Sequence, residues 1–216
     1  MPGSEAAAAF YFDLASPEAY IAAERILQTL TAPCEWRPIL ARELPHAESF
    51  DAYRCAEEQS IARSELERRA ARHGLQPLLW PAPFPFDSRP AMLAATYAKQ
   101  IGRTVAFAQA AFRQAFAGGH ALSDLDFVLI AAAACEMHPK AVLKAIATRS
   151  VADELGAATA AARELGVGDV PAVTVGTRVF VGEAQLEAAA AALDQASGTG
   201  SKPRGPAGND AIAARS

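Results

Sequence analysis

The sequence has few cysteines, and they are far apart. Among its 216 residues only Cys34, Cys55 and Cys135 are cysteines, and no two of them form a C-x-x-C pair. They also lack metal-ligand spacing with the four histidines, so the sequence predicts neither a metal site nor a disulfide framework. An odd, scattered set of thiols is typical of a reducing compartment, and we expect a cytoplasmic protein.

Long apolar runs and an excess of positive charge are also missing. No segment approaches the roughly 18 apolar residues that cross a bilayer, and residues 1–9 lack the basic segment and leucine-type core of a signal peptide. Twenty Lys and Arg face 24 Asp and Glu, for a net charge of −4. We therefore expect no membrane partner and no nucleic acid. The phosphate-binding loops and the G-x-S-x-G elbow of hydrolases are absent as well.

Alanine is the residue in excess. Its 53 copies make up about half of the 51% apolar share. Alanine favours helix and contributes little buried area, so the composition predicts a helix-rich protein. The length suits one large domain or two small ones.

The first forty residues predict a β-α-β unit. Residues 9–14 (AFYFDL) are typical of a strand, and Ser16-Pro17 indicates a helix start with serine as N-cap. Residues 34–40 predict a second strand, which Pro38 pushes toward a sheet edge or a bulge. Such a unit usually gives a parallel pair of strands.

The middle of the chain predicts helices without strands. Residues 49–73 carry charge at helical spacing, and their Glu- and Arg-rich face (57–72) is expected to be a solvated surface. Residues 75–90 hold five of the fourteen prolines and predict an extended stretch. Further helices are expected at 90–101, 104–117, 124–136 and 139–147.

Strands return near the end of the chain. A helix is expected at 150–165, then strands at 171–175 and 178–181 joined by the Gly176-Thr177 turn, and a last helix at 183–193. From residue 195 the composition predicts a disordered tail.

This order of elements resembles a thioredoxin fold with an all-helical insertion, as in the DsbA-like family. Residues 11–20 (YFDLASPEAY) look like the family's strand-to-helix start, and residues 166–173 (GVGDVPAV) look like its segment with a cis-proline, here Pro171. The resemblance spans residues 9–193 and implies an α/β fold. The domains it implies are a discontinuous thioredoxin-like domain at 9–42 and 150–194, a helical insertion domain at 43–149, and the disordered tail at 195–216.

Ser16 stands where redox members of the family place the first cysteine of C-x-x-C. Disulfide exchange needs a thiolate and a resolving thiol, so the segment SPEA (16–19) argues against a dithiol oxidoreductase. Serine followed by proline instead resembles the branch of 2-hydroxychromene-2-carboxylate isomerases and kappa-class glutathione transferases. The resemblance implies that glutathione brings the thiol and that Ser16 is the catalytic residue, which stabilises the thiolate at a helix N-terminus. The alternative is a plain N-cap serine.

The resemblance also implies where glutathione binds. A cis Val170–Pro171 bond would expose backbone groups that can pair with the cysteinyl part of the ligand, the alternative being a proline that simply starts a strand. After the hairpin, relatives commonly read W-G-x-D-R-L, whereas residues 181–186 read VGEAQL, without the Asp-Arg pair. Glu183 either replaces one of those charges or is an ordinary first-turn acid. The implied cofactor-binding residues are Val170, Pro171, Val181, Gly182, Glu183 and Ala184.

The substrate site is implied by two further stretches. The isomerases carry a lysine after the second strand, near the place of His46, and Arg42 is the other candidate cation for a substrate carboxylate. Residues 81–88 (PAPFPFDS) resemble the family's F-P-x-N-T stretch, and its phenylalanines either line a wall for an aryl substrate or belong to the core. The implied substrate-binding residues are His46, Arg42, Tyr53, Phe86 and Asp87.

The function expected from this resemblance is a glutathione-dependent isomerase. Its substrate would be a small aromatic acid of the 2-hydroxychromene-2-carboxylate or hydroxybenzylidenepyruvate type, converted by thiolate addition, bond rotation and elimination. A kappa-class-like glutathione transferase and a redox-inactive thioredoxin-fold binding protein without glutathione are the alternatives. Relatives often pair, so a homodimer is a further expectation.

Overall fold

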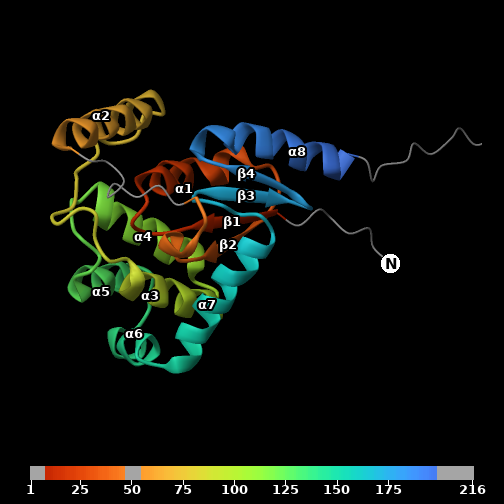
Figure 1. Cartoon of the computed structure of the whole chain (residues 1–216). Helices are drawn as coiled ribbons and strands as arrows, with labels where there is room; N and C mark the ends of the chain where they lie inside the picture. The colour runs from red at the N-terminus through yellow and green to blue at the C-terminus, as the bar shows by residue number, and fades with distance from the viewer. Residues whose placement is uncertain (1–7, 47–54, 199–216) are drawn as a thin grey trace, which may run out of the picture.

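The structure is a computed structural model that describes residues 8–46 and 55–198. Its centre is one four-stranded sheet with the strand order β2-β1-β3-β4 (Figure 1). The strands are β1 (Ala8–Phe12), β2 (Cys34–Pro38), β3 (Ala172–Val175) and β4 (Arg178–Val181). β1 runs parallel to β2 and antiparallel to β3, and β3 and β4 form the hairpin. The predicted parallel pair is thus confirmed, as is the edge position of the strand that contains Pro38.

Helices cover both faces of the sheet and extend well beyond it. They are α1 (Pro17–Thr29), α2 (Ala56–Arg72), α3 (Arg89–Gln100), α4 (Thr104–Phe116), α5 (Leu125–Ala134), α6 (Pro139–Ile146), α7 (Arg149–Glu164) and α8 (Leu186–Gly198). Two short 3-10 helices, η1 (Ala41–Glu43) and η3 (Glu183–Gln185), follow β2 and β4. The predicted α/β fold with a helical insertion between the second and third strands is confirmed.

The faces of the sheet are set by alternation along β1. Phe10 and Phe12 belong to the core that includes residues of α1 and α8, while Ala9 and Tyr11 pack in a second cluster with Ala162 of α7. Figure 1 shows α8 and α7 on different sides of the sheet. The core that contains Phe10 and Phe12 continues without a break into α3, α4 and α5. Trp36 of β2 belongs to it and packs edge-on against Phe10, with ring centroids 4.9 Å apart. One core therefore supports both the sheet and the inserted helices.

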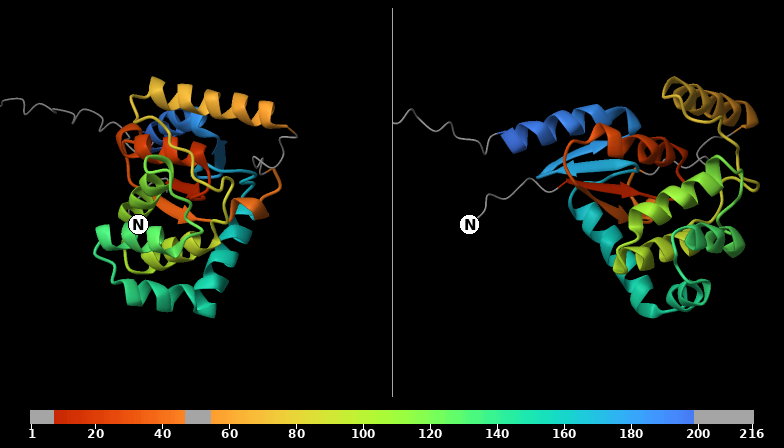
Figure 2. Two further views of the ribbon diagram at one scale, coloured as in Figure 1. Left: turned by 90° about the vertical axis from the view of Figure 1, so that its left-hand side faces the viewer. Right: turned by 180° about the vertical axis from the view of Figure 1, so that it is seen from behind.

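Helix α2 lies at one end of the molecule, beside the N-terminal half of α1 (Figure 2). Leu66 and Ala70 are its only buried residues, so it packs with little apolar area. It begins at Ala56 with Cys55 as N-cap, seven residues later than the predicted start at Ser49. The capping box of Cys55 and Glu58 fixes that start.

The end of the chain also departs from the expected boundaries. Helix α8 reaches Gly198, beyond the predicted end at Leu193, so the predicted tail begins too early. Its remaining residues, 199–216, lie outside the described residues.

Candidate active site

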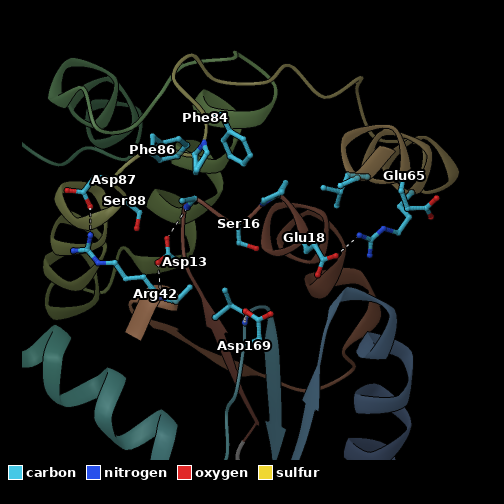
Figure 3. Close-up of a pocket in the computed structure, with 18 residues that line it drawn as sticks. Asp13, Ser16, Glu18, Arg42, Glu65, Phe84, Phe86, Asp87, Ser88 and Asp169 are labelled. Atoms are coloured by element: carbon cyan, nitrogen blue, oxygen red, sulfur yellow. Dashed lines mark hydrogen bonds and ion pairs between the residues drawn. The ribbon is translucent and has the colours of Figure 1, made fainter. Parts of the chain in front are cut away.

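A cavity of about 430 Å³ opens beside the turn that joins β1 to α1 (Figure 3). Six segments contribute to it: that turn, the first turn of α1, η1, α2, the proline-rich stretch and the loop before β3. The lining residues are Asp13, Ala15, Ser16, Pro17, Glu18, Ala41, Arg42, Ala62, Glu65, Leu66, Arg69, Phe84, Pro85, Phe86, Asp87, Ser88, Asp169 and Val170. Ligand sites of α/β proteins commonly lie at such a strand end.

Ser16 lines the cavity at the N-terminus of α1. Its Oγ accepts a hydrogen bond from the backbone N–H of Ala19 at 3.1 Å, which makes it the N-cap. A hydroxyl that accepts in this way still has its own proton to donate. The two interpretations of Ser16, helix cap and ligand donor, are therefore compatible.

Asp13 is a buried carboxylate that sequence reasoning did not single out. It accepts hydrogen bonds from the backbone N–H groups of Ala15 and Ala41, each at 2.9 Å, and from the Ser88 side chain. These partners belong to three different walls of the cavity (Figure 3). Asp13 therefore holds the segment of Ser16 in place relative to those of Arg42 and Asp87. An acid directly after an apolar strand was the signal that could have revealed it.

Burial raises the pKa of Asp13 above its ordinary 3.8, although its hydrogen bonds act in the opposite direction. The folded protein therefore binds this proton more tightly than the unfolded chain does. The stability that this proton contributes is complete below the unfolded pKa and is lost as the pH rises through the folded pKa.

We predict that Asp13→Asn, which does not titrate, removes this dependence. The unfolding free energy of the wild type minus that of the variant should fall between about pH 4.5 and pH 8. Urea unfolding followed by circular dichroism at both pH values measures the two unfolding free energies. The other titrating groups are the same in both proteins, so their contributions cancel in the difference. A difference that stays constant or grows over this range would contradict the prediction.

The predicted substrate residues Arg42 and Asp87 contact each other on one side of the cavity. Arg42 Nη1 lies 3.1 Å from Asp87 Oδ1, and the two side chains are 54% and 53% exposed. Phe84 and Phe86 lie close by and line the cavity, and both also pack against the core. Both residues are therefore part of the core and also border the cavity, and their role toward an aryl substrate stays a prediction.

The aromatic wall is continuous with α2 through Trp80. The rings of Trp80 and Phe84 meet edge-on with centroids 5.1 Å apart, and the Arg63 guanidinium lies 4.9 Å from the Trp80 ring centroid. Trp80 Nε1 also donates to Glu67 Oε1 at 2.7 Å. Two residues of α2 thereby hold the wall in place.

His46 is exposed and lies outside the cavity lining. Its backbone N–H donates to the Gly168 carbonyl oxygen at 2.9 Å, and its ring lies where a side chain on Gly168 would begin. A Cβ there would come within 2.6 Å of the imidazole Cδ2, so a larger residue at this position would displace the His46 ring. Tyr53, another predicted substrate residue, lies outside the described residues.

The Val170–Pro171 bond is cis, as predicted. Val170 lines the cavity beside Asp169, and its N–H donates to Asp169 Oδ1 at 2.7 Å. The Pro171 carbonyl accepts from Gly182 at 2.8 Å, which ties this loop to the end of β4. Pro171, Val181, Gly182, Glu183 and Ala184 do not line the cavity.

Glu183 is engaged inside the protein. It is 3% exposed, and its Oε1 lies 2.5 Å from Arg25 Nη1 and 2.9 Å from His73 Nε2. Its Oε2 lies 3.6 Å from Nη1 of Arg69, which also forms an ion pair with Glu18. We call Glu183, Arg25, Arg69 and His73 the Glu183 cluster. It connects α1, η3 and α2.

The face of α2 that was expected to be solvated contributes to the cavity. Ala62, Glu65, Leu66 and Arg69 line it. No local sequence pattern indicated that this face of α2 lines a cavity, because the position of α2 depends on ion pairs with distant parts of the chain.

Within the part of the chain that the structure describes, no helix has the length and hydropathy needed to cross a membrane. Over the same residues, no group of three or more His, Cys, Asp or Glu side chains is arranged to hold a metal ion.

Comparisons with known proteins agree with this architecture. A comparison of the sequence with curated proteins found no match. Among solved structures, a 2-hydroxychromene-2-carboxylate isomerase superposes with a TM-score of 0.75 at 20% identity, over 90% of this chain and 99% of that one. A probable DsbA oxidoreductase from Streptomyces coelicolor gives 0.73 at 20% identity, over 97% and 99%. The cytosolic disulfide reductase DsbM from Pseudomonas aeruginosa, solved with GSH, gives 0.61 at 12% identity, over 89% and 98%.

At such identities these structures establish the fold alone. The family model of the DSBA-like thioredoxin domain matches residues 8–194, which is most of the chain. The chain belongs to the DSBA-like thioredoxin domain family.

Proposed function

We propose that the protein is a glutathione-dependent isomerase of an aromatic acid that carries a conjugated double bond, of the 2-hydroxychromene-2-carboxylate or hydroxybenzylidenepyruvate type. The observation that carries the proposal is Ser16, which caps α1 and lines a cavity that also has an aromatic wall. A fold likeness to a 2-hydroxychromene-2-carboxylate isomerase supports it.

In this proposal Ser16 stabilises the thiolate of glutathione. The N-terminus of α1 favours an anion, and the Ser16 hydroxyl donates a charge-assisted hydrogen bond to the sulfur. The thiol proton leaves to solvent when glutathione binds. The serine itself forms no covalent bond.

The reaction then balances without an oxidant or a reductant. The thiolate forms a C–S bond at the carbon beside the aryl ring, and the π electrons move to the conjugated carbonyl oxygen. Rotation about the new single bond follows. The electron pair returns, the double bond re-forms, and the C–S bond breaks to release the thiolate.

The opposite side of the cavity holds the substrate in this proposal. Phe84 and Phe86 face the aryl ring, and Arg42 receives the carboxylate. Arg42 uses Nη1 for Asp87, and its planar fork offers further N–H groups to a second carboxylate. A kappa-class-like transferase would use the same thiolate but release a stable conjugate.

A redox-inactive binding protein is the second candidate, and two observations favour it. The Val170 N–H already donates to Asp169, and Glu183 is held by three cations. Both groups would otherwise serve the peptide clamp and the γ-glutamyl end of glutathione.

Calorimetry with glutathione tests the proposal. We expect binding at millimolar ligand or below, and weaker binding of S-methylglutathione because it cannot form a thiolate. Isomerisation of hydroxybenzylidenepyruvate should require added glutathione and return it unchanged. No heat at millimolar glutathione would overturn the proposal. That result would favour the second candidate, which does not use glutathione, whereas glutathione binding without isomerisation would favour the transferase.

A further inference from the structure

We propose that a second cavity, between the first half of β2 and the start of α4, binds a phosphoryl group. The cavity has a volume of about 680 Å³ and is lined by residues of β2, of the end of α3 and of the first turns of α4. It shares no lining residue with the cavity beside Ser16, which lies beyond the other end of β2. The inference is therefore independent of the proposed function.

The N-terminus of α4 meets this cavity without a capping side chain. The first N–H groups of a helix have no acceptor within it, and here they belong to Thr104, Val105 and Ala106, which all line the cavity. Arg103, the N-cap residue, makes no side-chain cap. The first intrahelical bond runs from the Phe107 N–H to the Arg103 carbonyl at 2.9 Å. The helix dipole favours an anion at this place.

Trp36 provides a second, independent sign of a ligand. The residue lines the cavity although it is only 2% exposed. Its Nε1–H is buried and has no hydrogen-bond acceptor among the described residues. A buried donor without an acceptor is costly, and a buried tryptophan N–H usually has one. In the proposal the missing acceptor is an oxygen of the ligand.

The charged groups around the cavity leave an excess of positive charge. Lys99, Arg37 and Arg103 oppose Glu35 and Glu136. Lys99 Nζ lies 3.1 Å from Glu35 Oε1, and Arg103 Nη2 lies 3.0 Å from Glu136 Oε2. All five side chains are at least 36% exposed. Such pairs are weak, so a ligand can share their cations.

This balance favours a phosphoryl group over a carboxylate. The one excess positive charge and the partial charge of the helix start add up to about +1.5, and a phosphate ester carries about −1.5 to −2 at neutral pH. Its three oxygens also offer more acceptors than the two of a carboxylate. Burial raises the pKa of the Cys34 thiol to about 12, so this lining residue adds no charge.

Calorimetry on the full chain tests this with inorganic phosphate, phenyl phosphate and acetate in a phosphate-free buffer. We expect phosphate to bind with a Kd of about 1 mM or below, and acetate to bind about ten-fold more weakly or not at all. Tighter binding of phenyl phosphate would identify an organic phosphate as the ligand. Equal or weaker binding would identify free phosphate, and both results support the site.

Two pairs of variants locate the bound phosphate. Trp36→Phe keeps an aromatic ring but removes the N–H, and should weaken phosphate binding about ten-fold. Its control is Trp80→Phe, because the Trp80 N–H is bonded to Glu67 outside this cavity. Lys99→Gln, a surface change, covers the case in which Trp36→Phe does not fold, and should also weaken binding. Its control is Lys144→Gln, an exposed lysine that does not line the cavity. Both controls should keep the wild-type affinity.

Three results would overturn the inference. They are no binding of phosphate at millimolar concentration, acetate binding as tight as that of phosphate, and an unchanged phosphate affinity in Lys99→Gln or in a folded Trp36→Phe. None of them bears on glutathione binding beside Ser16.

Discussion

Replacing Ser16 by alanine is expected to lower kcat for isomerisation by about 10²–10³-fold, the usual effect of removing one donor to a reacting anion. The hydroxyl is the only side-chain donor that the helix start offers to the sulfur, because Pro17 and Ala19 have none and Glu18 is an acceptor. Initial rates at saturating glutathione measure the loss. An unchanged kcat in Ser16→Ala would remove Ser16 from the reaction.

Two controls separate this loss from the loss of a helix cap, which costs about 1 kcal/mol. Asp124 caps α5 by accepting from Asp126 N–H at 3.0 Å, away from the cavity lining. Asp124→Ala should lose similar stability and retain the rate. Ser16→Thr retains a hydroxyl and should keep more activity than Ser16→Ala.

Replacing Glu183 by alanine is expected to destabilise the fold by about 3–5 kcal/mol. The carboxylate is 3% exposed, and its removal leaves Arg25, which is 12% exposed, without its buried partner. The substitution also releases Arg69 and His73, so the attachment of α2 should weaken. Urea unfolding followed by circular dichroism measures the change.

Glu187 provides a matched control, because it pairs with the same Arg25 but is 61% exposed. Glu187→Gln should cost less than about 1 kcal/mol. Glu183→Gln, which keeps the shape and removes the charge, covers the case in which the alanine variant does not fold. Equal losses at the two positions would contradict a special role for Glu183.

The sequence patterns were sufficient where structure depends on neighbouring residues. Ser16-Pro17 predicts the start of α1, and the alternation around Gly176-Thr177 predicts the hairpin, because caps and turns need only a few residues. The cis bond at Pro171 followed from a family segment, not from the residues themselves.

The patterns failed where placement depends on residues far along the chain. Glu183 meets Arg25 across 158 positions, and Arg69 meets Glu18 across 51. The polar sequence of α2 contains no apolar face that would reveal this docking. For the same reason, the sequence suggested Glu183 as a ligand residue. Nothing near it in the chain indicates the three basic side chains that contact its carboxylate. Its role toward glutathione stays a prediction.

The two tryptophans give this protein a built-in optical readout. Trp36 is 2% exposed among core aromatic rings, so its emission should be blue-shifted and should change on global unfolding. Trp80 is half-buried between α2 and Phe84, one ring away from the cavity. Its fluorescence should respond to an occupied cavity or to a displaced α2. A Trp36→Phe variant would therefore report ligand entry, and a Trp80→Phe variant would report folding.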